Sequence, residues 1–201
     1  MSATTAARRG FTLPGQGTGE EPEWTVLATL AVALLLGLIL QAAVTGASRT
    51  ASVSGMSLSY PAKWSTVRDA GTLFTARDLL GGTSTARVAV SELTDTADIG
   101  RGASARSVAL ADQLLGFHIA STRRETVNGR ETAQIEYVYV IAQAGSAPVL
   151  MRGIDTVAAS GGKTYVLSFV APDEDFGDLA TRRLPRMSST FHDILDSWRL
   201  P

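Results

Sequence analysis

The hydrophobic positions of this chain form one long apolar run near the start, followed by many short alternating segments. Residues 24–47 contain no Lys, Arg, Asp, Glu or His and consist mostly of Leu, Ala, Val and Ile. About 20 apolar residues in a helix cross the hydrocarbon core of a bilayer, and a helix satisfies its own backbone hydrogen bonds there. The pattern therefore predicts a single transmembrane helix that begins at Trp24 and ends at Ala47, with the lipid bilayer as its partner.

A cleaved signal peptide is the competing interpretation of this run. Its apolar region spans about 7–15 residues and ends in a small-x-small site, whereas this run is longer and its end at Thr45, Gly46 and Ala47 is a mediocre site. Arg8 and Arg9 with Phe11 resemble a twin-arginine export pattern, but a Glu-containing spacer separates them from the run. We expect an uncleaved anchor.

The two parts flanking the anchor differ in composition. Residues 1–23 have almost nothing to bury, which predicts a disordered tail. The arginine pair in this tail favours a cytoplasmic amino terminus under the positive-inside rule, which places the rest on the extracytoplasmic side of the cell membrane. Residues 48–55 are a predicted linker, and residues 56–201 have the size of one domain.

Alternating apolar and polar positions predict a series of strands in this domain. They cover residues 56–60, 72–77, 86–93, 120–127, 131–141, 149–158 and 163–171. The Asn128-Gly129 pair favours a tight hairpin turn, and the Gly81-Gly82 and Gly161-Gly162 pairs favour two more. In the last strand Tyr165, Leu167 and Phe169 share one face. Neighbouring strands should therefore pair antiparallel.

Two helices complete the predicted fold. Ser104 is expected to cap a helix that runs to about Leu115 and buries one apolar face. The expected buried residues are Val108, Ala111, Leu114 and Leu115. A second helix over about 185–198 carries one apolar stripe, made of Met187, Phe191, Ile194, Leu195 and Trp198. The predicted fold class is α+β, an antiparallel β-sheet sandwiched by α-helices.

Composition narrows the possible functions. The chain has 18 Lys plus Arg against 19 Asp plus Glu and no Cys. The balanced charge argues against nucleic-acid binding. The absence of Cys excludes disulfides, thiolate nucleophiles and thiolate metal ligands.

The polar clusters in the chain have both a chemical and a structural interpretation. Asp173, Glu174, Asp175 and Asp178 could hold Ca²⁺ but lack the further ligands of a calcium loop, and a capped helix start explains them better. His118 and His192 have no second ligand nearby, so neither predicts zinc. The glycine pairs lack the phosphate-loop pattern. The basic groups Arg123-Arg124 and Arg182-Arg183-Arg186 are interpreted as solvated, with an acidic partner or lipid headgroups as the alternative. We predict no catalytic, cofactor-binding or metal site and no cofactor.

Two stretches resemble a known family. Residues 57–64, with Tyr60, Pro61 and Trp64, are similar to the opening strand of PsbP-like domains. Residues 169–172 and the second helix, with Phe191 and Trp198, are similar to their last strand and helix. This superfamily includes extrinsic PsbP proteins of photosystem II, a Ran-binding nuclear import factor and bacterial exported proteins. The resemblance implies a sheet between helices that docks on partners without catalysis, and it transfers no functional residue.

Two hypotheses of function follow. The first is a non-catalytic, membrane-anchored, extracytoplasmic domain that binds another membrane protein, as an accessory or assembly subunit of a complex. The second is a tethered carrier or sensor of a small ligand, in which Tyr137, Tyr139, Met151 and Phe169 line a pocket. A pocket of a few hundred cubic ångströms under the helices would favour the second, and a filled core with an exposed apolar patch the first.

Overall fold

The computed structural model describes residues 23–45, 47–79, 85–93, 98–142, 144–176 and 186–201. The chain separates into two compact units, Met1–Val44 and Thr45–Pro201.

Helix α1 (Glu23–Thr45) forms the part of the first unit that the structure describes, at the position of the predicted anchor. The side chains described in it are those of residues 26–38, and all of them are exposed. Within the part of the chain that the structure describes, no helix is both long enough and apolar enough to cross a membrane.

The second unit is built on an antiparallel sheet of seven strands in the order β3-β4-β5-β9-β8-β7-β6. Its strands are β3 (Ser65–Thr66), β4 (Phe74–Arg77), β5 (Arg87–Leu93), β6 (His118–Val127), β7 (Arg130–Ile141), β8 (Val149–Ser160) and β9 (Lys163–Pro172). A separate hairpin consists of β1 (Ser48–Val53) and β2 (Met56–Pro61). The helices are α2 (Ile99–Gln113), α3 (Asp173–Phe176) and α4 (Arg186–Ser197).

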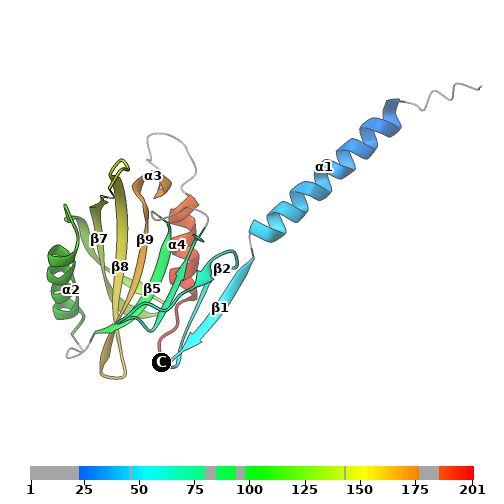
Figure 1. The fold of residues 1–201 in the computed structure, drawn as a ribbon. Coiled ribbons are helices and arrows are strands. Elements are labelled where there is room, and N and C mark those ends of the chain that lie inside the picture. The colour runs from blue at the N-terminus through cyan, green and yellow to red at the C-terminus, as the bar shows by residue number, and fades with distance from the viewer. Residues whose placement is uncertain (1–22, 46, 80–84, 94–97, 143, 177–185) are drawn as a thin grey trace, which may run out of the picture. The chain divides into compact units, whose positions relative to one another are not determined.

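Helices cover both faces of the sheet, as predicted (Figure 1). One face carries α2, and the core between them includes Ile135, Tyr137 and Val166. The other face carries α4, and the core there includes Trp64, Phe169 and further large apolar residues. The strand faces agree with the alternation, because Tyr165, Leu167 and Phe169 all belong to the α4-side core. The α+β sandwich predicted from the sequence is confirmed.

The predicted linker over residues 48–55 is wrong, because these residues form β1 and a tight turn. Ser54 and Gly55 have φ angles of 52° and 79°, the left-handed backbone that a two-residue hairpin turn requires. β1 then pairs with β2 over its whole length. Ala51 and Val53 pack against the α4-side core, so this Ser/Thr-rich segment is a strand with one half-buried face.

The first predicted helix is correct in type but not in start or orientation. α2 begins five residues before the predicted cap, where the side chain of Asp98 accepts a hydrogen bond from the backbone N–H of Arg101. Its buried residues are Gly102, Ala103 and Leu110. Of the four residues expected to be buried, Leu114 is half-buried against the α2-side core, whereas Ala111 is exposed and Val108 and Leu115 are 63% and 65% exposed. The helix turns small residues toward the sheet, since a Cβ on Gly102 would lie 3.1 Å from Thr164 Cγ2.

The hairpin and the last helix agree with the prediction. Asn128 and Gly129 have φ angles of 51° and 77° and join β6 to β7. In α4, Phe191, Ile194 and Leu195 are buried, as is Trp198 just beyond it. The Gly81-Gly82 turn and the side chain of Met187 lie outside the described residues.

Candidate functional site

A buried polar cluster attaches α2 to the centre of the sheet. Asp155 on β8 is 0% exposed although it carries a carboxylate. One of its oxygens accepts from Arg106 Nε of α2 at 2.5 Å, and the other accepts from the Tyr137 hydroxyl at 3.1 Å. Arg106 Nη2 also donates to Ser168 Oγ at 3.2 Å. A buried carboxylate needs such a set of donors, so the cluster fixes α2 on the sheet.

The surroundings of the cluster control the ionisation of its members. Burial raises the pKa of Tyr137 well above its ordinary value, and the negative charge of Asp155 adds to the effect. Burial alone would lower the pKa of Arg106, but the charge and hydrogen bond of Asp155 outweigh it and the pKa is raised. Both groups therefore keep their protons at neutral pH, which suits a structural ion pair rather than a proton-transfer site.

Gly153 makes room for this cluster. It lies opposite Tyr137 in the register of β7 and β8, and a Cβ on Gly153 would come within 2.3 Å of Tyr137 Cζ. Only glycine lets the tyrosine ring lie across β8 toward Asp155. The sequence signal for this site is Asp155 alone, the single carboxylate of β8, on the same strand face as Gly153 and Val157; its partners are not visible in the local pattern.

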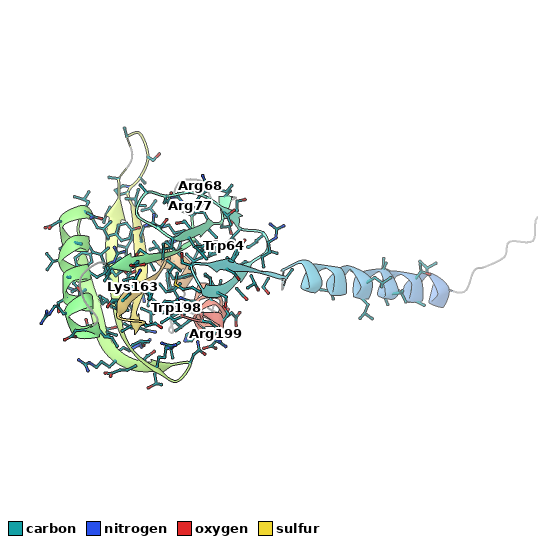
Figure 2. The ribbon with its side chains drawn as sticks, turned by 90° about the horizontal axis from the view of Figure 1, so that it is seen from below. Trp64, Arg68, Arg77, Lys163, Trp198 and Arg199 are labelled. Carbon is teal, nitrogen blue, oxygen red and sulfur yellow. The ribbon has the colours of Figure 1, made fainter. Side chains whose placement is uncertain are left out.

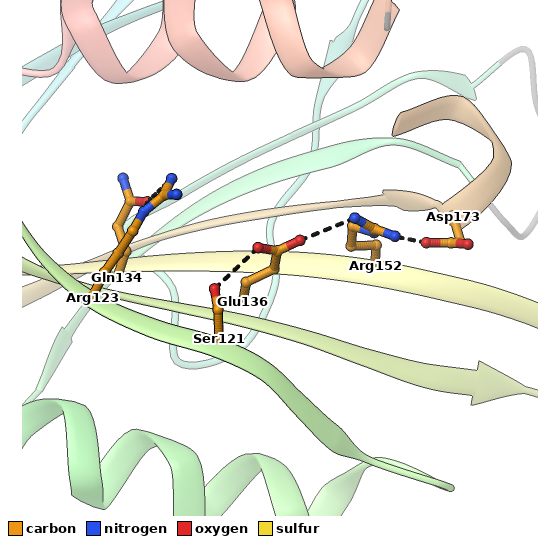
Figure 3. A network of polar contacts seen from close by, with 6 residues as sticks. All are labelled: Ser121, Arg123, Gln134, Glu136, Arg152 and Asp173. Atoms are coloured by element: carbon orange, nitrogen blue, oxygen red, sulfur yellow. Dashed lines mark hydrogen bonds and ion pairs between the residues drawn. The ribbon is translucent and has the colours of Figure 1, made fainter. Parts of the chain in front are cut away.

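A second polar network lies on the opposite face, across β6, β7, β8 and the start of α3 (Figure 3). Ser121 Oγ donates to Glu136 at 3.2 Å, and Glu136 accepts from Arg152 Nη1 at 3.0 Å. Arg152 Nε donates to Asp173 Oδ1 at 2.7 Å, and its guanidinium lies 5.6 Å from the centre of the Phe176 ring. These pairs are about one-third exposed, so they order the surface without contributing much stability.

Two buried polar groups beside this network have no hydrogen-bond partner. They are Gln134 Nε2 and Thr156 Oγ1, which belong to residues opposite each other on β7 and β8. Gln134 uses its carbonyl oxygen to accept two hydrogen bonds from Arg123, at 2.9 and 3.2 Å. Figure 3 shows this pair apart from the Glu136 network.

The predicted acidic cluster and histidines have ordinary structural positions. Asp173 begins α3, as the helix-start interpretation predicts, and pairs with Arg152. Asp178 lies outside the described residues. His118 and His192 are exposed, on β6 and α4. Among the residues that the structure describes, no three His, Asp or Glu side chains are placed to hold a metal ion.

The basic groups and glycine turns also have local explanations. Arg123 and Arg124 each pair with a glutamate, Glu125 and Glu131 respectively. Arg182 and Arg183 and the side chain of Arg186 lie outside the description. Gly161 and Gly162 have positive φ angles in the turn between β8 and β9, as predicted for a hairpin.

The four residues expected to line a ligand pocket are core residues instead. Tyr137, Tyr139, Met151 and Phe169 are between 0% and 6% exposed. Phe169 lies on the α4 side of the sheet and the other three on the α2 side. None of the cavities that the structure describes is lined by any of them. The core at these positions is therefore filled by the protein itself.

An apolar surface is exposed on α2 and beside it. Val108 and Ala111 are three residues apart and share a side of the helix, and Leu115 follows the helix end; all three are exposed. We call these three residues the outer surface of α2. A separate groove of about 470 Å³ lies between α2 and β6, lined by Ala103, Ile119, Arg124 and Ile135 among others. β6 is also one of the two edge strands of the seven-stranded sheet.

Comparison with solved structures identifies the fold, whereas comparison of sequences does not. No family model and no characterised protein sequence matches the chain. Among solved structures, cyanobacterial PsbP (CyanoP) from Synechocystis is 16% identical with a TM-score of 0.54, covering 77% of this chain and 92% of its own. The Ran-binding protein Mog1p of Saccharomyces cerevisiae is 10% identical with a TM-score of 0.50, covering 76% and 95%. LpqN of Mycobacterium tuberculosis, involved in cell envelope biogenesis, is 15% identical with a TM-score of 0.49, covering 76% and 89%.

The architecture is thus an antiparallel sheet between helices, and the particular version is the PsbP-like fold. The resemblance seen in the sequence around Tyr60, Trp64 and Trp198 is confirmed at the level of the fold. At these identities the likeness defines the fold alone, and the function has to be argued from the chain's own residues.

Proposed function

We propose that this chain is a membrane-anchored accessory subunit, whose extracytoplasmic domain binds another membrane protein and has no catalytic activity. One observation in the structure supports the proposal of a membrane anchor. The large apolar side chains described in α1 are each between 54% and 63% exposed. They are Val26, Leu27, Leu30, Val32, Leu34, Leu35, Leu36 and Leu38.

These side chains surround the helix rather than forming one stripe, since Leu34, Leu35 and Leu36 are consecutive and point in three directions. A helix that is apolar on all sides is at home only in a protein core or in lipid. The described side chains of α1 cover only residues 26–38, whereas the uncharged stretch in the sequence extends over residues 24–47. The proposal of a bilayer anchor rests on this longer stretch.

The domain itself supports partner binding over a carrier role. Its core is filled at the four residues expected to line a pocket, while the outer surface of α2 leaves Val108 and Leu115 uncovered. Contiguous apolar surface marks interaction sites, and we take these two side chains as the candidate contacts with the partner. Mog1p, which has the same fold, is described as Ran-binding, which is consistent with a protein-docking use of this architecture.

Fractionation of cells tests the anchor. The full chain should stay with membranes after high-salt washing and need detergent for release. The double substitution Leu35→Arg and Leu36→Arg places two charges at the helix centre, at about 2.5–3.5 kcal/mol each, and should shift the chain to the supernatant. Recovery of the unaltered chain without detergent would refute the proposal.

Crosslinking in membranes tests the partner. The native chain should recover a stoichiometric integral membrane protein. Val108→Glu with Leu115→Glu should abolish this product, whereas Leu79→Glu with Leu150→Glu, at two other exposed apolar positions, should not. A clean monomer, or equal loss in both variants, would contradict partner binding through α2.

A further inference from the structure

A small cavity lies where the β6–β7 turn meets the carboxyl-terminal segment. It has a volume of about 200 Å³, and its lining includes Asn128, Arg130, Ala158, Trp198, Arg199 and Leu200. Pockets for drug-sized ligands usually span about 300–1,000 Å³. This cavity therefore suits a molecule of only a few non-hydrogen atoms.

The walls of the cavity are held in place by the fold. Asn128 Nδ2 donates to the carbonyl oxygen of Trp198 at 2.8 Å, which fixes the turn against the end of α4. Backbone hydrogen bonds of 3.0 and 2.8 Å join Arg199 to Ser57 on β2. Trp198 and Ala158 are 3% and 1% exposed, so they form a packed apolar wall. Figure 2 shows Trp198 and Arg199 close together at the end of α4.

Two arginines, Arg130 and Arg199, bring positive charge to this cavity, and among the residues that the structure describes neither forms an ion pair with Asp or Glu. Arg130 Nη1 donates to Ser160 Oγ at 3.0 Å and to the Ala159 carbonyl at 3.5 Å. Arg199 Nη1 donates to the carbonyls of Asp196 and Trp198, at 2.6 and 3.1 Å. These acceptors are uncharged, and Ser160 Oγ in turn donates to the backbone oxygen of Pro201 at 2.5 Å. The residues that line the cavity include no Asp or Glu.

Most donors of the two guanidinium groups remain available. A guanidinium has five N–H donors, and only one nitrogen of each arginine is engaged in these hydrogen bonds. Arginine with unused donors is the side chain best suited to binding a carboxylate or phosphate. The cavity thus combines two cationic groups with the apolar wall of Trp198 and Ala158.

We propose that this cavity binds a small organic carboxylate, with its charged end between Arg130 and Arg199 and a short apolar body against Trp198. This site goes beyond the proposed partner binding and uses none of its residues. Its ligand class follows from the charge, the volume and the lining of the cavity alone.

A titration of the isotope-labelled full chain in detergent with sodium butyrate tests the site. The backbone amide signals of Asn128, Arg130 and Arg199 should shift and saturate, whereas butyramide, which has the same size but no charge, should not shift them. Arg130→Gln and Arg199→Gln should each weaken butyrate binding by about tenfold or more, since a charge-assisted hydrogen bond is lost. Arg68→Gln, at an exposed arginine outside the cavity, should leave the affinity unchanged.

Several results would overturn the assignment. They are the absence of saturable shifts, equal shifts with butyramide, equal weakening by Arg68→Gln, and binding of inorganic phosphate but not of butyrate. Arg130→Lys and Arg199→Lys keep the charge and should retain more affinity than the glutamine variants. If the glutamine variants bind butyrate as tightly as the native chain while the other amide signals stay native, the two arginines do not carry the site and the proposal fails.

Discussion

At the scale of single residues, Asp155 carries the largest predicted effect on stability. It is fully buried and accepts hydrogen bonds from Arg106 and Tyr137. Asp155→Ala leaves a half-buried guanidinium and a buried hydroxyl without their partner, and breaking a buried pair costs about 3–5 kcal/mol. Urea denaturation should show a loss of this size in the free energy of unfolding. Glu131→Ala removes a pair whose side chains are 59% and 70% exposed, and its effect should stay within about 1 kcal/mol.

Tyr137 makes the stability depend on alkaline pH. Its pKa in the folded chain is raised well above 10.0, first by burial and then by Asp155. Above pH 10 the unfolded chain therefore loses the Tyr137 proton while the folded chain keeps it, so stability is full below that pH and falls as the pH rises, by up to about 1.4 kcal/mol per unit. Denaturation of Tyr137→Phe between pH 9 and 11 should show a shallower fall. The same substitution at the buried Tyr60 is the control, and an unchanged slope in Tyr137→Phe would contradict the assignment.

The residue scale also shows why the buried cluster could not be predicted. Asp155 is visible in the sequence as a charge between Gly153 and Val157, on the face that alternation assigns to the core. Its partner Arg106 lies 49 positions away along the chain. Nothing in local periodicity connects a strand residue with a helix residue at that separation, so the pairing appears only once the sheet and α2 are assembled.

At the scale of elements, the start of α2 differs between prediction and structure: the sequence predicts a cap at Ser104, and the observed cap is Asp98. Asp98 accepts from the backbone N–H of Arg101, and hydrogen bonds from Arg101 and Gly100 lower its pKa. Ser104 Oγ instead donates to the Gly100 carbonyl inside the helix. Asp98→Ala should reduce the hydrogen-exchange protection of the Gly100 and Arg101 amides and lower the urea midpoint, because N-cap side chains satisfy the free amides of the first turn. Ser104→Ala should change neither, and the opposite result would restore the cap at Ser104.

The elements differ in how well their pattern predicts them. The Asn128-Gly129 turn and the stripe of α4 are local signals, and both were correct because a turn or a helix face depends on a few neighbouring residues. The orientation of α2 was wrong because Gly102 and Ala103, rather than the larger Val108, fit close to the sheet. β1 was missed because its Ser and Thr residues resemble a linker, and only pairing with β2 makes it a strand.

At the scale of the whole molecule, local pattern cannot supply the order of the strands. Hairpins such as β6–β7 and β8–β9 join neighbours in sequence, but β9 also pairs with β5, from Arg87 opposite Val170 to Leu93 opposite Thr164. The two cores lie on opposite faces of the sheet that this long-range pairing completes. Periodicity did not predict this pairing, and the family resemblance around Tyr60 and Trp198 implied a sheet between helices without an order of strands.

At the scale of the whole chain, the proposed topology predicts that the domain lies outside the cell and the amino-terminal tail inside. The chain has no cysteine, so single introduced cysteines can test this. Ser160 is a poor position for a reporter, since its hydroxyl bonds to Arg130 and to Pro201. Ser146 is exposed in the turn between β7 and β8, so Ser146→Cys should leave the fold unchanged. With the domain outside, a membrane-impermeant maleimide should label Ser146→Cys in intact cells. A cysteine placed at Ser2, in the predicted cytoplasmic tail, should react only after lysis. Labelling of Ser2→Cys but not of Ser146→Cys in intact cells would reverse the orientation while leaving the anchor in place.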